Sequence, residues 1–169
     1  MITPAYARTL AAYNAEMNRR VYAAAARLSD DERRADRGAF WRSIHGTLSH
    51  LLWADHLWMA RLDGWPRPTI GAPDSPGYIA DFDEMHRLRQ TADAGMAEWA
   101  ARLEPADLEG TLNWYSGVKQ RDVSSPRGFI IANMFNHQTH HRGQAHALIT
   151  RAGEATGDTD LWMLIEGPL

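Results

Sequence analysis

Residues 136–144 read NHQTHHRGQ, a polar run inside a longer stretch with helical periodicity. At about 100° per residue, side chains three or four positions apart share one face of a helix. One such stripe has the pattern of a buried face and contains Ile130, Met134, His137, His141, Ala145 and Leu148. Two histidines therefore lie in the middle of an otherwise apolar face, whereas His140 and His146 point elsewhere.

The spacing of His137 and His141 predicts that both rings reach the same point. Side chains four positions apart have Cβ atoms about 5–6 Å apart on one helix face. A buried ring nitrogen without a partner costs about 1–3 kcal/mol, so these rings either hydrogen-bond to core carbonyls or a carboxylate, or bind a metal ion. A zinc-protease helix is excluded, because its first histidine is followed by a glutamate base and here by Gln138.

The composition limits the remaining possibilities. With 169 residues, of which 44% are hydrophobic, the chain can build one core, and we expect a single domain over residues 1–169. A net charge of −3 provides no basic surface for nucleic acid. Because the sequence contains no cysteine, a transition metal must be bound by imidazole, carboxylate or water.

The N-terminal residues predict a cytoplasmic protein. Residues 1–4, MITP, lack the basic patch and apolar run of a secretory signal. No apolar stretch approaches the roughly 18 residues of a membrane span, so we expect no membrane association.

Capping residues, prolines and glycines divide the chain into four long helices. We expect a helix from Thr3-Pro4 to about Leu28, and further helices over residues 38–64 (or starting at 40), 81–103 and 125–152. A short extra C-terminal helix is expected over 158–164, and a short extended piece or hairpin over 111–123. Residues 64–77 contain four prolines and three glycines, which predicts an ordered surface loop, a candidate lid between the second and third helices. The pattern favours an all-α fold, a four-helix bundle.

The second helix offers three histidines as a third ligand. His50 lies on its broad apolar side, whereas His45 and His56 fall on the polar side and are expected to be solvated or hydrogen-bonded at the surface. Asp55 also projects from an apolar face and therefore needs a partner. It either orients a ligand imidazole from the outer shell or forms a buried salt bridge to an arginine.

Two segments together resemble the signatures of the DinB/YfiT-like family. The first is residues 49–55, SHLLWAD, and the second is Asn136-His137 followed by His141-Arg142-Gly143-Gln144. The resemblance implies a four-helix bundle, usually a homodimer, in which three histidines bind nickel, zinc or a related divalent ion and water fills the open positions. By position these ligands are His50, His137 and His141. The resemblance implies no DNA binding.

Three imidazoles leave at least one coordination position open, which is typical of catalytic metal sites. The resemblance implies a metal-dependent transferase or hydrolase that acts on a small molecule, with a low-molecular-weight thiol cofactor as one source of the nucleophile. The alternative is a non-catalytic helical binding protein, or a dimer with a structural metal, for which a closed shell including Asp55 would argue. A di-iron carboxylate bundle is excluded, because the inward Glu and Glu-x-x-His pairs are missing.

Further residues are candidates for the surroundings of the ion. Arg142 either pairs with an acidic residue of another helix or binds substrate, and Trp53 and Gln138 are second-shell or pocket candidates. The aromatic residues that either pack in the core or shape a pocket are Trp53, Trp58, Trp65, Trp114 and Tyr115.

Overall fold

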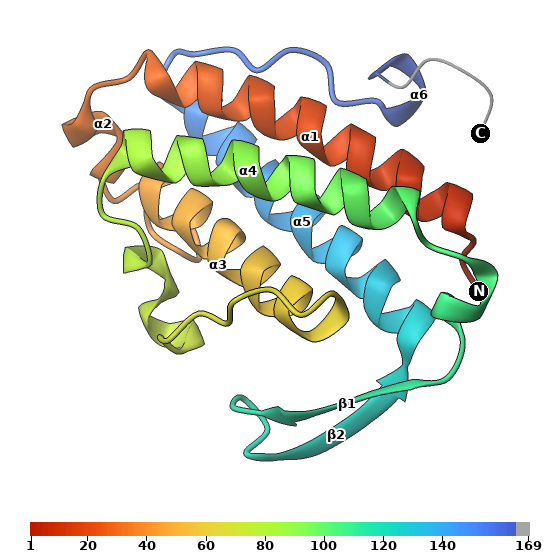
Figure 1. The fold of residues 1–169 in the computed structure, drawn as a ribbon. Coiled ribbons are helices and arrows are strands. Elements are labelled where there is room, and N and C mark those ends of the chain that lie inside the picture. Colours follow the sequence, from red (N-terminus) through yellow and green to blue (C-terminus); the bar gives the residue numbers. More distant parts are fainter. Residues whose placement is uncertain (165–169) are drawn as a thin grey trace.

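The computed structural model describes residues 1–164, and most of these residues are helical (Figure 1). The elements are α1 (Pro4–Ala26), α2 (Asp30–Arg34), α3 (Ile44–Leu62), η1 (Ala72–Gly77), α4 (Phe82–Ala101), η2 (Pro105–Leu108), β1 (Thr111–Ser116), β2 (Arg121–Pro126), α5 (Arg127–Arg151) and α6 (Leu161–Leu164). The prediction of a mostly helical chain is confirmed. The antiparallel β1–β2 hairpin lies where an extended piece or hairpin was expected.

Four long helices lie side by side, and each packs against two others (Figure 1). Helix α1 contacts α4 and α5, and α3 contacts the same two helices. The proline-rich loop after α3 includes η1, which packs back against α3, and the hairpin connects α4 to α5. Among the described residues, no helix has the length and apolar composition required to cross a bilayer.

Short polar side chains start three of the long helices. Thr3, Ser43 and Asp81 cap α1, α3 and α4, each by accepting a hydrogen bond from the backbone N–H three residues later, at 3.1, 3.0 and 2.7 Å. These bonds satisfy amide groups that have no partner inside the helix. Just after the C-terminal end of α5, Gly153 has φ +93°, a conformation that glycine adopts without strain.

The expected start of the second long helix, at residue 38 or 40, is wrong, because α3 begins four to six residues later at Ile44. The chain makes a tight turn between Ala39 and Arg42, in which the Arg42 N–H donates to the Ala39 carbonyl at 2.8 Å and Arg42 has φ +66°. Trp41 therefore precedes α3 instead of lying in it. The turn packs tightly on the helix, because a Cβ at Gly46 would lie 2.5 Å from the Trp41 carbonyl oxygen.

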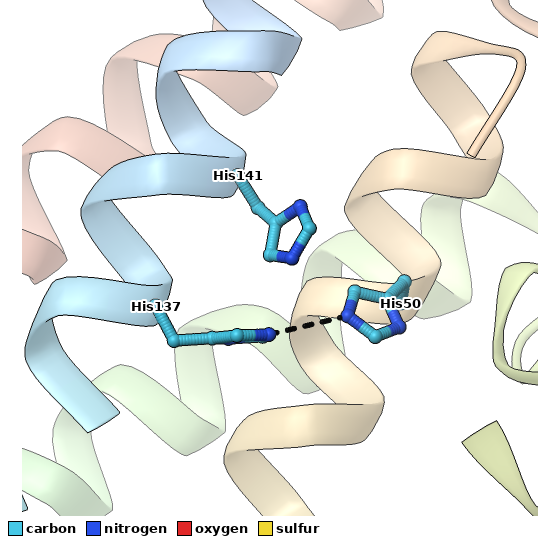
Figure 2. Close-up of side chains that lie close together, drawn as sticks. All are labelled: His50, His137 and His141. Carbon is cyan, nitrogen blue, oxygen red and sulfur yellow. Dashed lines mark hydrogen bonds between the residues drawn. The ribbon is translucent and has the colours of Figure 1, made fainter. Parts of the chain in front are cut away.

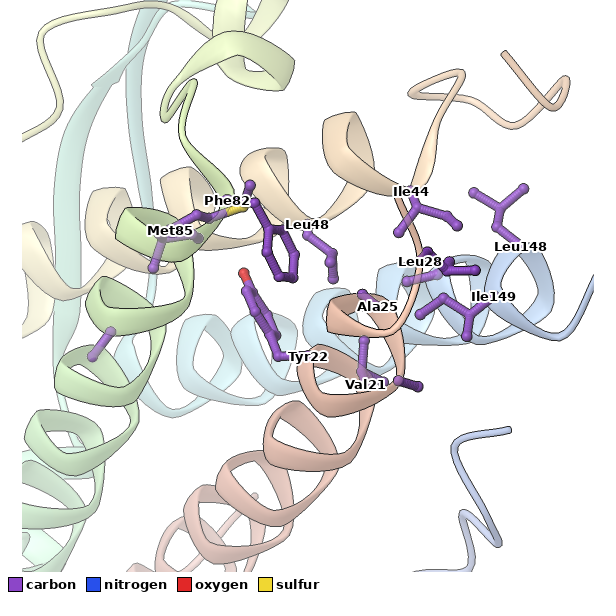
Figure 3. Packing of buried hydrophobic residues seen from close by; sticks show 14 residues of the cluster. Val21, Tyr22, Ala25, Leu28, Ile44, Leu48, Phe82, Met85, Leu148 and Ile149 are labelled. Atoms are coloured by element: carbon purple, nitrogen blue, oxygen red, sulfur yellow. The ribbon is translucent and has the colours of Figure 1, made fainter. Parts of the chain in front are cut away.

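The apolar core consists of two clusters, one toward each end of the long helices. The first joins all four long helices (Figure 3) and includes Val21, Tyr22, Ala25, Leu28, Ile44, Leu48, Phe82, Met85, Leu148 and Ile149. The second includes Met59, Met96, Trp99, Ile131, Met134 and Phe135.

A charged network is buried at the helix positions between these clusters. Arg89 of α4 is only 1% exposed, and its guanidinium contacts Asp55 of α3 at 2.5 Å and Asp93 at 2.9 Å. Asn18 of α1 donates to Asp93 at 2.8 Å. Burial alone would lower the pKa of Arg89, but the carboxylates of Asp93 and Asp55 outweigh it and raise that pKa. The network therefore ties α1, α3 and α4 together through a charged arginine.

Candidate metal centre

The three histidines chosen as ligands lie together between α3 and α5 (Figure 2). His50 comes from α3, and His137 and His141 come from successive turns of α5. Each ring offers one nitrogen, and these nitrogens lie within 4.8 Å of one another. The Nε2 atoms of His50 and His137 are 3.4 Å apart. Two nitrogens bound to one tetrahedral zinc ion, each about 2.0–2.1 Å from it, would be about 3.3 Å apart, so the spacing fits a shared ion.

The hydrogen bonds of His50 leave its Nε2 as the available donor atom. The Ser75 hydroxyl donates its proton to the Ala72 carbonyl at 2.6 Å. It can therefore only accept from His50 Nδ1, which lies 2.7 Å away. Nδ1 carries the proton, and the unprotonated Nε2 faces His137.

The same logic applies to His141. Its Nδ1 lies 2.8 Å from the side-chain oxygen of Gln144, which can only accept, so Nδ1 is protonated and Nε2 is available for an ion. For His137, Nδ1 is buried and has no hydrogen-bond partner among the described residues. Two of the three rings are thus oriented by outer partners, as metal-bound histidines usually are.

Burial keeps the three imidazoles neutral near pH 7. Loss of solvent, with smaller contributions from the other two rings, lowers the pKa of His50 to about 3. Burial and the neighbouring His141 lower the pKa of His137 to about 4, and burial also lowers the pKa of His141. Since only a neutral imidazole binds a metal ion, the site is ready for ligation without first losing protons.

Two tryptophans flank His50. The Trp41 ring stacks on the imidazole with centroids 4.1 Å apart and an interplanar angle of 27°, and the Trp53 ring lies 5.7 Å away. The Trp53 indole N–H donates to the Ile70 carbonyl at 3.1 Å, which attaches the proline-rich loop to α3. The aromatic rings shield one part of the site from water.

A cavity of about 750 Å³ opens beside the histidines, and both His50 and His137 lie in its wall. Of the five aromatic residues considered from the sequence, Trp53, Trp58 and Trp114 line it, with Trp41 in addition. Trp65 instead packs against the core, and Tyr115 is exposed. The proline-rich loop contributes Arg67, Pro68, Ile70, Gly71, Ala72 and Pro73, so the candidate lid forms one wall.

The sequence of the chain also matches a known protein family. The model of the DinB family matches residues 1–167. The chain belongs to the DinB family. The resemblance seen in the two histidine segments is therefore confirmed, and the DinB family match extends to nearly the whole chain. No curated protein and no solved structure shows significant similarity to the chain.

The two outer-shell candidates Asp55 and Gln138 belong to the buried network. Asp55 forms the salt bridge to Arg89, the second of its two expected roles, and makes no hydrogen bond to a ligand histidine. The Gln138 amide donates to Asp55 at 2.9 Å and its oxygen accepts from Asn14. Gln138 follows His137 in α5, so its hydrogen bond to Asp55 of α3 anchors the backbone of the site rather than the rings.

The expected partner of Arg142 is wrong. Arg142 is buried and forms no salt bridge with a described acidic residue. Its guanidinium lies 5.4 Å from the centre of the Tyr13 ring and donates to the Thr139 hydroxyl at 3.3 Å. Arg142 also does not line the cavity beside the histidines, because it faces α1.

The other two histidines of α3 are not part of the cluster, but His45 is not at the surface. His45 is only 2% exposed, and its Nε2 lies 2.9 Å from the Ile79 carbonyl oxygen. His56 is half-buried, and its Nδ1 lies 2.9 Å from the Tyr78 hydroxyl. The loop after η1 covers this side of α3, which helical periodicity alone cannot reveal.

Sequence reasoning missed the roles of three residues that shape the site. Gln144 follows His141 by one turn, so its spacing was an available signal. Ser75 gave no signal, because it lies in the proline-rich loop 25 residues from His50. Trp41 was assigned to the second helix, and only the turn before α3 brings its ring onto His50.

Proposed function

We propose that this DinB-family chain binds one divalent ion through His50, His137 and His141 and uses it to transform a small molecule. The observation that carries the proposal is the position of His50 and His137 in the wall of the cavity of about 750 Å³. A ligand in this cavity would reach the ion. The volume suits a small molecule, since ligand pockets usually enclose about 300–1,000 Å³.

The proposed chemistry is group transfer or hydrolysis. A divalent ion in such a site, nickel or zinc, acidifies bound water or thiol and polarises carbonyl groups. The sequence contains no cysteine, so a thiol nucleophile would come from a low-molecular-weight cofactor. The chain itself contributes three neutral imidazoles, Ser75 and Gln144 as the groups that orient two of them, and the tryptophans that limit the access of water.

The alternative is a non-catalytic protein with a structural metal. A fourth protein ligand would favour it, but Asp55, the acidic candidate, is already engaged by Arg89 and Gln138. The open cavity beside the rings also supports the catalytic proposal. The homodimer and the cytoplasmic location stay predictions.

Cobalt substitution tests whether a coordination position is open. We expect the visible absorption of the Co²⁺-loaded protein to change when azide or a small thiol such as 2-mercaptoethanol is added, because an added ligand enters the metal's coordination shell. The metal content is measured before and after the addition. An unchanged spectrum at a constant cobalt content would favour the structural alternative.

Removal of the ion is expected to lower the melting temperature. An ion at a concentration one hundred times its Kd stabilises the native state by about 2.7 kcal/mol, which corresponds to roughly 5–10 °C for a chain of this size. Differential scanning calorimetry of the chelated and reloaded protein measures the shift. His137→Ala is the control, because a chelator should leave its melting temperature unchanged.

Ser75→Ala is expected to weaken metal binding by about 10–100-fold, because it removes the group that orients the His50 ring and holds its proton on Nδ1. Competition with a fluorescent zinc indicator measures the change. Ser124→Ala, at an exposed position of β2, is the matched control and should bind zinc as the wild type does. Equal affinities for the two variants would remove Ser75 from the proposed site.

A further inference from the structure

The end of the cavity remote from the histidines contains two arginines. Arg61 lies in the last turn of α3, and Arg67 lies in the proline-rich loop, and both line the cavity. Arg61 follows His50 by eleven positions in one helix, which places their backbones about 16 Å apart along the helix axis. The cavity therefore extends along α3 from the histidines to a positively charged end.

Neither arginine has an acidic partner within residues 1–164. Arg61 and Arg67 form no salt bridge, and no hydrogen bond to another described residue. None of the described residues that line the cavity is acidic. Arg61 is nevertheless half-buried. Burial, together with the nearby charge of Arg67, lowers the pKa of Arg61 to about 10. Two positive charges therefore lie near each other, and no described acidic side chain balances them.

Two indole rings hold Arg61 in place. Its guanidinium carbon lies 4.7 Å from the centre of the Trp58 ring and 5.5 Å from that of Trp114. The two rings meet edge to face, with centroids 5.8 Å apart. Stacking uses the flat face of a guanidinium and leaves its in-plane N–H donors available, the geometry in which arginine binds carboxylate or phosphate.

The wall between the two ends is mainly apolar. It includes Ala54, Leu57 and Ile70, and the uncharged polar side chains that line the cavity are Asn133 of α5 and Ser116 of β1. An apolar or aromatic section of a ligand would be favoured there, because its burial removes apolar surface from water.

We propose that Arg61 and Arg67 bind the anionic group, a carboxylate or a phosphate, of an elongated small-molecule substrate whose reacting end lies at the histidine cluster. The position of the reacting end rests on the proposed function, whereas the anion site does not need the metal. The ligand neutralises the two arginines, and its middle section fills the apolar part of the cavity.

Three probes with one alkyl chain test the charge preference. Decanoate, decylphosphonate and decanol are titrated by calorimetry into the intact protein, both metal-free and zinc-loaded, because an anionic group could also bind the zinc. We expect at least one anionic probe to bind about tenfold or more tightly than decanol, the usual effect of one charge-assisted hydrogen bond. The tighter of the two anions identifies the carboxylate or the phosphate class. Equal affinities for all three probes would overturn the proposal.

Charge-removing variants locate the site. Arg61→Gln should abolish the preference for the anion at unchanged zinc content, and Arg67→Gln, at an exposed position, should reduce it in the same direction. Arg8→Gln, at an exposed position of α1 outside the cavity, is the matched control and should keep the preference. A preference that survives both Arg61→Gln and Arg67→Gln would place the anion elsewhere and refute the assignment.

The two proposals fail separately. Anion binding that depends on Arg61 in a protein that takes up no metal would refute the proposed function and support the anion site. Zinc binding through the histidines without any preference for anions would do the reverse.

Discussion

His137→Ala and His141→Ala proteins are expected to purify with little or no bound divalent ion, whereas the wild type carries close to one ion per chain. Each substitution removes one of three nitrogen donors that lie within 4.8 Å of one another. The loss of affinity should exceed the about 10–100-fold that follows from loss of an outer-shell partner alone. Elemental analysis of the purified proteins, followed by zinc titration of the metal-free forms, measures both quantities.

His140→Ala is the matched control for this experiment. His140 lies in the same helix, next to His141, and its ring packs edge-on against the His141 ring with centroids 4.9 Å apart. Its side chain is exposed, its Nε2 contacts Gln144, and it does not belong to the group of converging nitrogens. We expect this variant to keep the metal content of the wild type. The same metal content in all three variants would reject His50, His137 and His141 as the ligand set.

Arg89→Met is expected to destabilise the fold by about 3–5 kcal/mol at pH 7, because it leaves the buried carboxylates of Asp55 and Asp93 without their positive partner. Urea unfolding of the metal-free protein measures the change without a contribution from the ion. Burial already raises the pKa of Asp93. A group whose pKa is raised in the folded state stabilises the native state at low pH, and this contribution to stability is lost as the pH rises. The deficit of the variant should therefore be smaller at pH 5 than at pH 7.

Arg34→Met provides the comparison at the surface. Arg34 forms an ion pair with Asp30 at 2.7 Å, four residues away in α2, and both side chains are solvated. Such pairs contribute less than about 1 kcal/mol. If the Arg89 and Arg34 variants lost equal stability, the buried network would not be the element that holds α1, α3 and α4 together.

Much of the fold follows from short-range patterns. The caps at Thr3 and Asp81 and the glycine after α5 place helix ends within a few residues of the observed ones, because capping acts between groups that are close in the sequence. The start of α3 was predicted wrongly, since the turn before it depends on the close approach of Trp41 to Gly46.

In the candidate site, too, local patterns predicted some residues and helix packing decided the roles of others. Helical periodicity alone selected the three clustered histidines, because a period of 3.6 residues assigns every side chain of a helix to a face before the partner helix is known. Periodicity left two roles open for Asp55, and the acidic partner that it suggested for Arg142 is wrong. Each depends on which residue of another helix lies opposite, and that is set by how the helices pack.

The amino-acid sequence by itself determined the existence of the long helices, the inward position of His50, His137 and His141, and the family, since these depend on local capping, periodicity and motif spacing. Only the tertiary structure decided that Ser75 orients His50, that Arg89 pairs with two carboxylates, and that Arg61 shares a cavity with the histidines. These contacts join residues from different elements, and their distances depend on loop conformation and helix packing, which no local pattern specifies.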